Sequence, residues 1–538
     1  MMKLIALLFV SFLGGMLYAS SFPFSNGQFF YLGSILGFML LILALNHSLK
    51  KREFILSAAF FNLGFGVLGF YWIAHTLKEF GGLSFPTNHL LAFIFNFLLA
   101  PQVYLFALIW FLTKKKSFSL GHHFAPLFFA FIYTVLEIFT PQQFPAHLGH
   151  TLLELGKFQG LKLTPIFGAG LYSFLIAWFA LELARLFSYR RFNLSLLFIP
   201  VIFIFDFSYS ETTKQPKEQS LHIRFVQPNI GNFLKINSES GGKDSIREVY
   251  DTYYSLSTVE SKSKLDLIVW PETAWPTLQS SELMRNENTI QPFMKNLITK
   301  TGTDLFFGGY DQVPNTFGYF ENEYNAAFYI KKNFQFGGVY HKMQLIPFGE
   351  TLPFGPLNAK LSELIRNVSF FAKGKDYTLF QMDNGRNFIS AICYEILFSD
   401  FIRDYLNAQK NEVHFLINLT NDSWYGETSE PWQHLFLARW RAVEFNLPII
   451  RSTNTGISTI IQANGDFKQY LATGNSGILD TVLTVKDRGP TLFQTYGILP
   501  LLILTVLLFA LHFLFHKLSN IVFTKKPIQK RIPSDDDF

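Results

Sequence analysis

The sequence predicts a multi-helix transmembrane region joined to an extracytoplasmic domain of the α/β class. The 538-residue chain is 49% hydrophobic with a mean hydropathy of +0.22, which is too apolar for one water-soluble globule of this length. Its apolar residues form long runs before about residue 207 and again after about residue 493. Between these regions, short β-rich runs alternate with helical ones, as they do in an α/β domain.

Eight apolar runs are candidate membrane helices, because a bilayer core of roughly 30 Å needs about 20 apolar residues per helix. In chain order they are Leu4–Ala19, Phe29–Leu45, Ile55–His75, Leu90–Leu112, Phe124–Phe139, Pro165–Phe187, Leu194–Phe207 and Tyr496–Phe515. The first, fifth and seventh runs are short, so their boundaries are the least well defined.

Basic residues gather in alternate loops between these runs. Lys50–Arg52 follow the second run, Lys114–Lys116 the fourth, and Arg190 with Arg191 the sixth. Because cytoplasmic loops carry the excess of Lys and Arg, we expect both termini in the cytoplasm and the middle domain outside it. The net charge of +6 therefore marks membrane topology, and no nucleic-acid partner is expected.

The first apolar run has a second interpretation. Met1 to Ser20 places Lys3 before an apolar stretch and small residues near Ala19, a pattern that also fits a cleaved signal peptide. Both interpretations leave the later topology unchanged, since the second helix starts outside the cytoplasm in each.

The middle region predicts six strands and four helices. The strands are Leu221–Gln227, Leu265–Trp270, Leu305–Gly309, Phe388–Cys393, Val413–Leu419 and Pro448–Ser452. The helices are Asp244–Thr258, Thr289–Thr301, Phe401–Gln409 and Trp432–Phe445.

Cys393 is the only cysteine, so no intramolecular disulfide can form and no cysteine cluster offers a zinc site. It ends the strand-like run FISAIC at a turn toward a helix, where a sharp turn exposes a nucleophile and leaves backbone N–H groups free. A buried structural cysteine fits this context equally well. A thiol with a pKa of about 8.5 also needs a nearby base and cation to react at neutral pH.

The sequence offers both groups. Glu272, in VWPETAWP, directly follows the apolar run that ends at Trp270, and Lys342 lies in YHKMQLIPFGE. Taken alone, each has an ordinary explanation: a solvated or helix-capping glutamate and a surface lysine.

The joint pattern is more specific than its parts. A Glu after WP, a Lys in HKMQLIPFGE and a Cys in ICYE, in this order, resemble the Glu/Lys/Cys triad of the nitrilase superfamily. The whole chain resembles the membrane-anchored apolipoprotein N-acyltransferase family. The resemblance extends through NLTNDSWYG (418–426), PWQHLFLARWRAVE (431–444) and RSTNTGIS (451–458).

The resemblance implies an architecture and a location. It implies about seven transmembrane helices at 1–210, a nitrilase-like αββα sandwich at 218–486, a final transmembrane helix at 494–516 and a cytoplasmic tail at 517–538. The protein would be a multi-pass component of a bacterial inner membrane, with its catalytic domain in the periplasm. We expect it to act as a monomer.

The resemblance also implies a reaction. A phospholipid would donate an acyl chain, and a diacylated apolipoprotein would accept it on the α-amino group of its S-diacylglyceryl-cysteine. Glu272 would take the proton, Cys393 would attack the phospholipid ester and become a thioester, and Lys342 with a backbone N–H near Tyr394 would stabilise the oxyanion. No cofactor and no metal are implied.

Several further residues would support this chemistry. Glu350 and Glu395 match acidic positions of the family, and we expect them to orient Lys342 and to hold the Cys393 turn. Tyr394 and Trp424 are expected to line the site, although packing explains each equally well. The chain departs from the family at Ile236, where some members have a tryptophan.

Two alternatives remain at this point. A membrane-tethered nitrilase-type amidase would use the same triad, with water as the acceptor, but would need only one anchoring helix. A transporter or receptor with an inactive sensing domain would not need an intact set of Glu272, Lys342 and Cys393.

Overall fold

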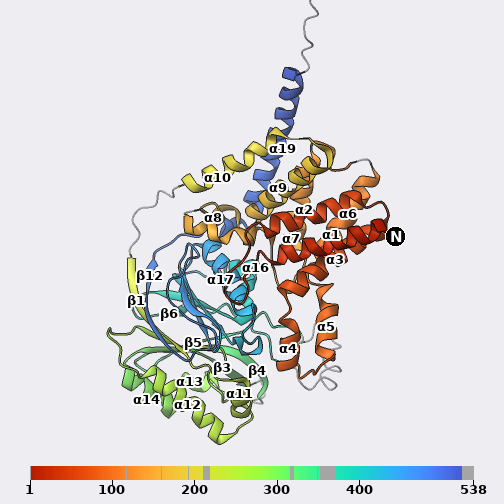
Figure 1. The fold of residues 1–538 in the computed structure, drawn as a ribbon. Helices are drawn as coiled ribbons and strands as arrows, with labels where there is room; N and C mark the ends of the chain where they lie inside the picture. Colours follow the sequence, from red (N-terminus) through yellow and green to blue (C-terminus); the bar gives the residue numbers. More distant parts are fainter. Residues whose placement is uncertain are drawn as a thin grey trace, which may run out of the picture.

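The chain folds into a bundle of apolar helices and a two-sheet α/β domain that lies against one end of the bundle (Figure 1). The computed structural model describes residues 2–116, 118–158, 160–191, 193–209, 218–314, 320–347, 349–351 and 371–523. Most of the expected cytoplasmic tail, 524–538, lies outside the described residues. The division of the chain at 1–210, 218–486, 494–516 and 517–538 stays a prediction.

A helix lies at each of the eight predicted apolar runs. The helices are α1 (Met2–Ala19), α2 (Gly33–His47), α3 (Lys51–Gly69), α4 (Ile73–Glu79), α5 (Thr87–Asn96), α6 (Pro101–Lys115), α7 (Ala125–Phe139), α9 (Gly170–Tyr189), α10 (Phe198–Ser208) and α19 (Leu499–Phe523). Within the described ranges, α1, the α5–α6 segment, α9 and α19 are long and apolar enough to cross a membrane. The pair α3–α4, bent by 63°, makes a fifth, whereas α2, α7 and α10 are shorter. Helix length alone therefore accounts for four or five of the eight expected spans.

Glycines let α1 pack closely on its neighbours. A Cβ at Gly15 would collide with the backbone of Phe61 on α3, and one at Gly14 would lie 2.9 Å from the carbonyl oxygen of Gly37 on α2. Small residues at such contacts are typical of helices that associate within lipid. Another face of α1 exposes Phe9, as expected of a surface that meets acyl chains.

The α/β domain contains two six-stranded sheets. The first has the order β12-β1-β2-β3-β4-β5 and contains β1 (Glu218–Gln227), β2 (Leu267–Val269), β3 (Asp304–Pro314), β4 (Phe320–Ile330), β5 (Phe336–His341) and β12 (Gly477–Lys486). The second has the order β11-β10-β9-β8-β7-β6 and contains β6 (Phe380–Gln381), β7 (Asn387–Ile392), β8 (Phe415–Thr420), β9 (Ile449–Thr453), β10 (Ser458–Ile461) and β11 (Tyr470–Leu471). Strands β1–β3 are parallel, as are β7–β9, and each of the six predicted strands is present.

Helices cover both outer faces of the paired sheets, which confirms the αββα sandwich. Between the sheets, the ring of Phe388 lies 5.2 Å from Phe306 and 5.4 Å from Tyr329. Helices α12 (Lys243–Ser257) and α14 (Pro292–Thr301) cover the first sheet, where the rings of Tyr253 and Trp270 lie 4.5 Å apart. Helices α16 (Ser399–Asn407) and α17 (Glu430–Phe445) cover the second. The four predicted helices are thus confirmed, with shifted ends.

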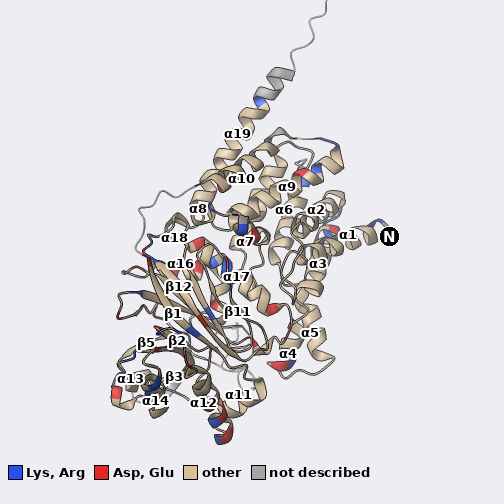
Figure 2. Ribbon diagram, turned by 60° about the vertical axis from the view of Figure 1, so that its left-hand side comes forward, with Lys and Arg blue, Asp and Glu red and all other residues tan. Residues whose placement is uncertain are grey.

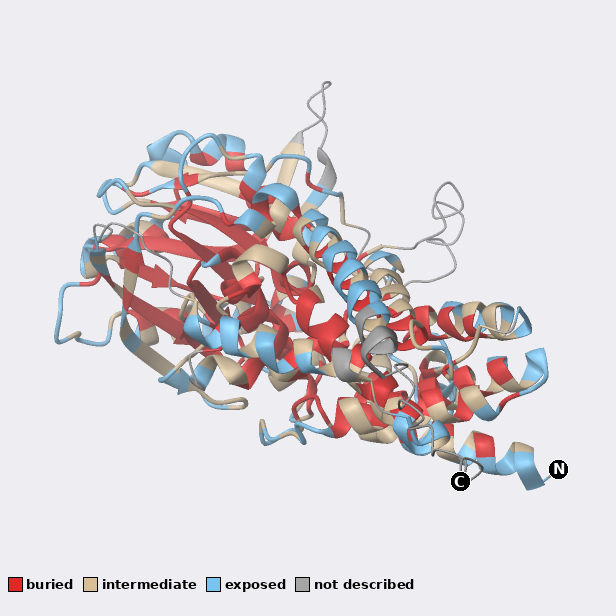
Figure 3. Ribbon diagram, turned by 90° about the horizontal axis from the view of Figure 1, so that it is seen from above, coloured by how far each residue is buried: buried red, intermediate tan, exposed pale blue. Residues whose placement is uncertain are grey.

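Helix α17 lies between the second sheet and the helix bundle. Gln433 Nε2 donates to the carbonyl of Gly69 at the end of α3 (2.9 Å), and Trp72 Nε1 donates to Gln433 Oε1 (3.1 Å). Arg439 pairs with Glu154 of the segment after α7 at 2.6 Å. Seen from above, buried residues fill the sheets and continue into this junction (Figure 3). The domain and the bundle therefore share one packed interior.

The helix ends that point away from the α/β domain carry basic residues (Figure 2). Lys3 begins α1, Lys114 lies in the last turn of α6, and Arg190 follows α9. Lys114 Nζ donates to the carbonyl of Ser48 (2.9 Å), so the adjoining ends of α6 and α2 lie together. This distribution is the one that the positive-inside rule expects of a cytoplasmic face.

Candidate active site

Glu272 lies just after the buried strand β2, where Pro271 ends the run. Its backbone passes close over β3, because a Cβ at Gly308 would lie 2.6 Å from the Cα of Glu272. The buried carboxylate accepts hydrogen bonds from Asn325 Nδ2 at Oε1 and from the backbone N–H of Asn421 at Oε2, both at 2.8 Å. Both oxygens are therefore fixed in one orientation.

Lys342 follows β5 and is completely buried. Its Nζ lies 2.8 Å from Glu350 Oε1 and 3.4 Å from Glu272 Oε1. Burial works against the ammonium charge, but the two carboxylates outweigh it and hold the pKa of Lys342 above its usual range. Lys342 therefore provides a permanent cation beside Glu272.

Cys393 follows β7 and begins the short 3-10 helix η5 (Cys393–Leu397) with a φ of +51°. A positive φ is strained for a residue with a side chain, and strained turns of this kind present nucleophiles in several enzymes. Burial, together with the charge of Glu272, raises the pKa of the thiol, while Lys342 opposes the rise. Of the three residues selected from the sequence, Lys342 and Glu272 are thus in contact, and the charges of both reach the thiol of Cys393.

Glu395 joins the Cys393 turn to the segment around Lys342. Its Oε2 accepts the N–H of Ile392 at 2.7 Å, and its Oε1 accepts the N–H groups of Met343 and Gln344 and the hydroxyl of Tyr340 at 2.6 to 2.9 Å. Burial raises the pKa of this carboxyl to about 7. The side chain holds the Cys393 turn and the segment that follows Lys342 in register.

Asn325, on β4, connects the two carboxylates that flank Lys342. Its Nδ2 donates to Glu272 Oε1 at 2.8 Å and to Glu350 Oε1 at 3.1 Å, while Glu350 Oε2 accepts the N–H of Ile346 at 2.9 Å. Sequence analysis did not identify Asn325, since this residue lies inside a strand with no neighbouring motif.

Tyr394 and Trp424 lie toward the helix bundle. The hydroxyl of Tyr394 donates to the carbonyl of Gln143 after α7 (2.7 Å), and its ring packs on Phe398. The half-buried ring of Trp424 meets Phe80 at the end of α4, with centroids 4.9 Å apart. Both side chains brace the domain against the bundle, and a contact with substrate remains a prediction.

A second buried lysine lies beside the three central residues. Lys235, on α11 (Asn232–Glu239), contacts the hydroxyl of Thr273, and its charge reaches Glu272 and Cys393. Burial lowers the pKa of Lys235. Sequence analysis did not identify Lys235. Its neighbour on the same helix, Ile236, at which the chain departs from the family, is 46% exposed.

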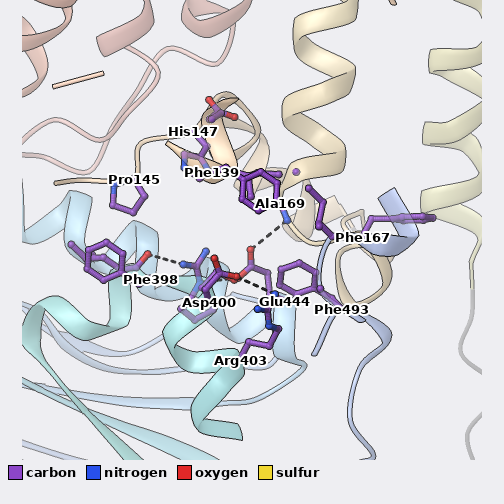
Figure 4. A pocket seen from close by; sticks show the side chains of 18 of the residues that line it. Phe139, Pro145, His147, Phe167, Ala169, Phe398, Asp400, Arg403, Glu444 and Phe493 are labelled. Atoms are coloured by element: carbon purple, nitrogen blue, oxygen red, sulfur yellow. Dashed lines mark hydrogen bonds and ion pairs between the residues drawn. The ribbon is translucent and has the colours of Figure 1, made fainter. Parts of the chain in front are cut away.

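A cavity of about 750 Å³ lies behind the Cys393 turn, between the bundle and the domain. In Figure 4, Phe139 and Phe167 of the bundle side face Phe398, Asp400 and Glu444 of the domain across this space. Apolar and polar side chains line both sides of the cavity. Two of the lining residues, Leu397 and Phe398, follow Cys393 closely in the chain. It lies at the level where the membrane helices end.

Two family models match the chain. Residues 226–490 match the model described as "Carbon-nitrogen hydrolase", and residues 14–181 match the model described as "Apolipoprotein N-acyltransferase N-terminal domain". The first covers most of the sandwich and contains Glu272, Lys342 and Cys393, and the second covers most of the bundle.

Curated relatives match nearly the whole chain. A protein from Haemophilus influenzae named apolipoprotein N-acyltransferase is 31% identical over 533 residues, which cover 94% of both chains. A protein of the same name from Bdellovibrio bacteriovorus is 30% identical over 426 residues, or 75% of both chains. A solved structure of a nitrilase-superfamily member from Saccharomyces cerevisiae is 15% identical, covers 54% of this chain and 98% of its own, and has a TM-score of 0.34.

Proposed function

Because the chain belongs to the apolipoprotein N-acyltransferase family, we propose that it transfers a phospholipid's acyl chain, through a thioester on Cys393, to S-diacylglyceryl-cysteine apolipoproteins. The acceptor is the N-terminal α-amino group, and the product is a triacylated lipoprotein. One chain supplies every group of the site, which supports a monomeric enzyme.

In the first half-reaction, Glu272 takes the thiol proton while the sulfur of Cys393 attacks the ester carbonyl. The oxyanion that forms is stabilised by the Lys342 ammonium and the backbone N–H of Tyr394. As the intermediate collapses, the C–O bond breaks, and Glu272 returns the proton to the departing oxygen of the lysophospholipid. A thioester remains on Cys393.

In the second half-reaction, the neutral α-amino group of the apolipoprotein attacks the thioester carbonyl. A C–N bond forms, the C–S bond breaks, and Glu272 carries the proton from the amine to the sulfur. A thioester suits this step, because it is a competent acyl donor to an amine.

One observation carries the proposal: the fully buried Lys342 lies between Glu272 and Glu350, beside a cysteine on a strained turn. The buried thiol keeps its proton at neutral pH, so attack needs a base in contact with it, and Glu272 supplies that base. Tyr394 and Trp424 line the route by which lipid reaches the site from the bundle side.

The test is the covalent intermediate. The purified chain is mixed with phospholipid alone, and its intact mass is measured before and after hydroxylamine, which cleaves thioesters. We expect an increase of one acyl group that hydroxylamine removes, and no increase in Cys393→Ala or Glu272→Gln. The exposed Glu282→Gln is the control. An unacylated wild-type chain, or full transfer by Cys393→Ala, would contradict the proposal.

Hydrolysis of a small amide, the alternative that uses the same triad, is not favoured. The bundle matches the N-terminal domain of the acyltransferase family, and both reported relatives carry the acyltransferase name. A bundle beside the site gives two lipid substrates lateral access, which a soluble amide does not require.

The proposed location is a bacterial inner membrane, with the sandwich in the periplasm and both termini in the cytoplasm. The basic residues at the helix ends away from the sandwich support it. In a Cys393→Ala background, a membrane-impermeant maleimide applied to the periplasmic side should label Ser263→Cys on the sandwich and leave Lys115→Cys unlabelled. The reverse pattern would contradict this topology.

A further inference from the structure

His434, on α17, contacts the backbone of the nucleophile. Its Nε2 lies 3.2 Å from the carbonyl oxygen of Cys393, and the imidazole is buried. A carbonyl oxygen can only accept a hydrogen bond, so Nε2 must carry a proton for this contact to be favourable. The contact supports the residue whose φ is strained.

The other nitrogen of His434 faces two carboxylates. Nδ1 lies 3.4 Å from Glu430 Oε1 and 3.7 Å from Asp422 Oδ1, and all three side chains are buried. Burial lowers the pKa of His434 well below its usual range, so the ring is neutral and Nδ1 is an acceptor. Three acceptors facing one another without a proton would repel.

Nδ1 of His434 has no hydrogen-bond partner among the described residues, and neither has Oε2, the second carboxylate oxygen of Glu430. A small cavity of about 20 Å³ is lined by both side chains and by Gln433. This volume accommodates one water molecule, and the lining offers the polar partners that a buried water needs.

Asp422 is the less suitable place for an extra proton. Its Oδ2 pairs with Arg451 Nη2 at 3.0 Å, and its Oδ1 accepts a bond from Thr420 at 3.2 Å. A Cβ at Gly456 would collide with its carboxylate, so the loop fits Asp422 closely. Glu430 has no ion pair with a lysine or arginine within the described residues, only the approach to His434.

We propose that Glu430 keeps a proton at neutral pH and shares it with His434 Nδ1, directly or through one water, and so fixes the Nε2–H tautomer that holds the Cys393 carbonyl. Glu430 and His434 are positioning residues in this arrangement. The effect of this arrangement on acyl transfer rests on the proposed function of Cys393. The presence of the proton on Glu430 does not depend on that function.

The groups around Glu430 favour its protonated form. Burial, followed by the charge of Asp422, raises the pKa of Glu430 well above its usual range, and Arg451 only partly opposes this. The other titratable groups that face Glu430 are His434 and Tyr425. The bundle contributes aromatic side chains to this wall, namely Phe22, Phe65, Phe70, Trp72 and Phe144.

A divalent cation is the competing occupant, because Asp422, Glu430 and His434 offer ligand atoms within 4.8 Å of one another. The guanidinium of Arg451 on Asp422 opposes a second positive charge there. Elemental analysis of the purified wild-type chain after dialysis against buffer should give far less than one metal ion per chain. A stoichiometric metal that is lost in Glu430→Gln would overturn the proposal.

The first test measures stability against pH. A carboxyl with a raised folded pKa binds more protons folded than unfolded, so its contribution to stability falls as pH rises above about 4.5. Glu430→Gln lacks this titration. Its unfolding temperature relative to wild type should therefore increase steadily from pH 4.5 to 7.5. The exposed Glu427→Gln should stay parallel to wild type. Parallel curves for Glu430→Gln would show an ionised Glu430 and overturn the proposal.

The second test measures the effect on Cys393. Because the chain has one cysteine, the rate of thiol alkylation by a small iodoacetamide reports on that site alone. Glu430→Gln, whose amide still donates to Nδ1, should alkylate at the wild-type rate. Glu430→Leu should differ by about tenfold, the effect on a rate of losing one buried hydrogen bond. Equal rates for the two variants would overturn the coupling to Cys393.

The two proposals fail separately. If wild type forms no acyl adduct but Glu430→Gln shows the pH-dependent gain in stability, the proposed function is wrong and the shared proton stands. If the adduct forms and the stability curves are parallel, the shared proton is wrong and the proposed function stands.

Discussion

At the scale of single residues, the site depends on balanced burial of charge. Lys342 is completely buried, and only its two carboxylate neighbours make that charge tolerable. The same carboxylates are stabilised by Lys342 and Asn325, which lie between them, and each also accepts one backbone N–H. Removing one member therefore leaves the others without compensation.

Lys342→Met tests this balance. We expect loss of the acyl-enzyme by about a thousandfold, since the oxyanion loses its cation. The variant should also lose about 3 to 5 kcal/mol of unfolding free energy at pH 7.5, because two buried carboxylates are left unpaired. Chemical denaturation at pH 7.5 measures the loss.

The matched control for Lys342→Met is Lys331→Met. Lys331 also forms an ion pair, with Asp383, but that carboxylate lies at the surface. Surface pairs contribute about 1 kcal/mol or less. Equal losses in the two variants would mean that burial of the central cluster has no special effect.

Glu395→Ala tests the link between the two catalytic segments. The change removes the acceptor of three backbone N–H groups and one hydroxyl, and we expect a loss of about 3 kcal/mol or more. Tyr340→Phe removes only one of these bonds and should cost about 1 kcal/mol. Denaturant titration of both variants gives the comparison, and similar costs would show that the backbone bonds contribute little.

Sequence analysis identified the site residues that lie in recognisable motifs. It did not identify the site residues that lie outside such motifs. Glu272, Lys342 and Cys393 could be selected because each lies in a distinctive segment that follows a strand. Glu350 and Glu395 could be selected because they match acidic positions of the family that the sequence resembles. Asn325 and Lys235 could not, since their importance comes from packing between segments distant in the chain. The roles assigned to all of these residues stay predictions until measured.

At the scale of elements, the parallel strands set the position of the chemistry. Glu272 follows β2, Cys393 follows β7 and Asn421 follows β8, each at the carboxyl end of a parallel strand. Functional groups gather at this edge in open α/β sheets, because the loops there converge. The position of Glu272 also depends on β3, because the backbone of Glu272 packs closely on Gly308 of that strand.

Gly308→Ala tests that path. The added methyl group would lie 2.6 Å from the Glu272 backbone, so Glu272 must shift. A displacement of this kind is expected to lower the rate of acyl-enzyme formation by about a hundredfold, with the fold retained. Gly231→Ala, where a Cβ meets nothing within 4 Å, is the control. An unchanged rate for Gly308→Ala would show that Glu272 does not need its present position.

Strand prediction succeeded where burial was uniform. The fully buried runs at β2, β8 and β9 were visible as apolar segments. In contrast, β12 was missed because it lies at an edge and carries a polar, half-exposed face. The membrane helices were located as runs of apolar residues, but their breaks at α3–α4 and α5–α6 were not, since continuous hydrophobicity does not reveal a bend.

At the scale of the whole molecule, the bundle and the sandwich form one interior through α17. Fourteen of the sixteen residues of this helix are buried, including those that face the bundle. A helix that is buried all round belongs to the core of a larger body. The sandwich therefore has one covered face that it cannot expose to water.

The isolated sandwich, residues 218–486, should consequently aggregate without detergent. Its exposed α17 face would exceed the few hundred Å² of contiguous apolar surface that soluble monomers tolerate. Size-exclusion chromatography compares this fragment with the full chain in detergent. A monodisperse fragment would show that the bundle is not part of the folding unit.

The nearly complete burial of Cys393 has a consequence for chemical durability. Periplasms are kept oxidising, and accessible thiols there become disulfides or sulfenic acids. With 4% of the residue exposed and no second cysteine in the chain, the sulfur is shielded from large oxidants and lacks an intramolecular partner. If the sandwich lies in the periplasm as proposed, the same enclosure that keeps the thiol protonated at rest would thus let the sulfur of Cys393 stay reduced in a compartment that oxidises accessible thiols.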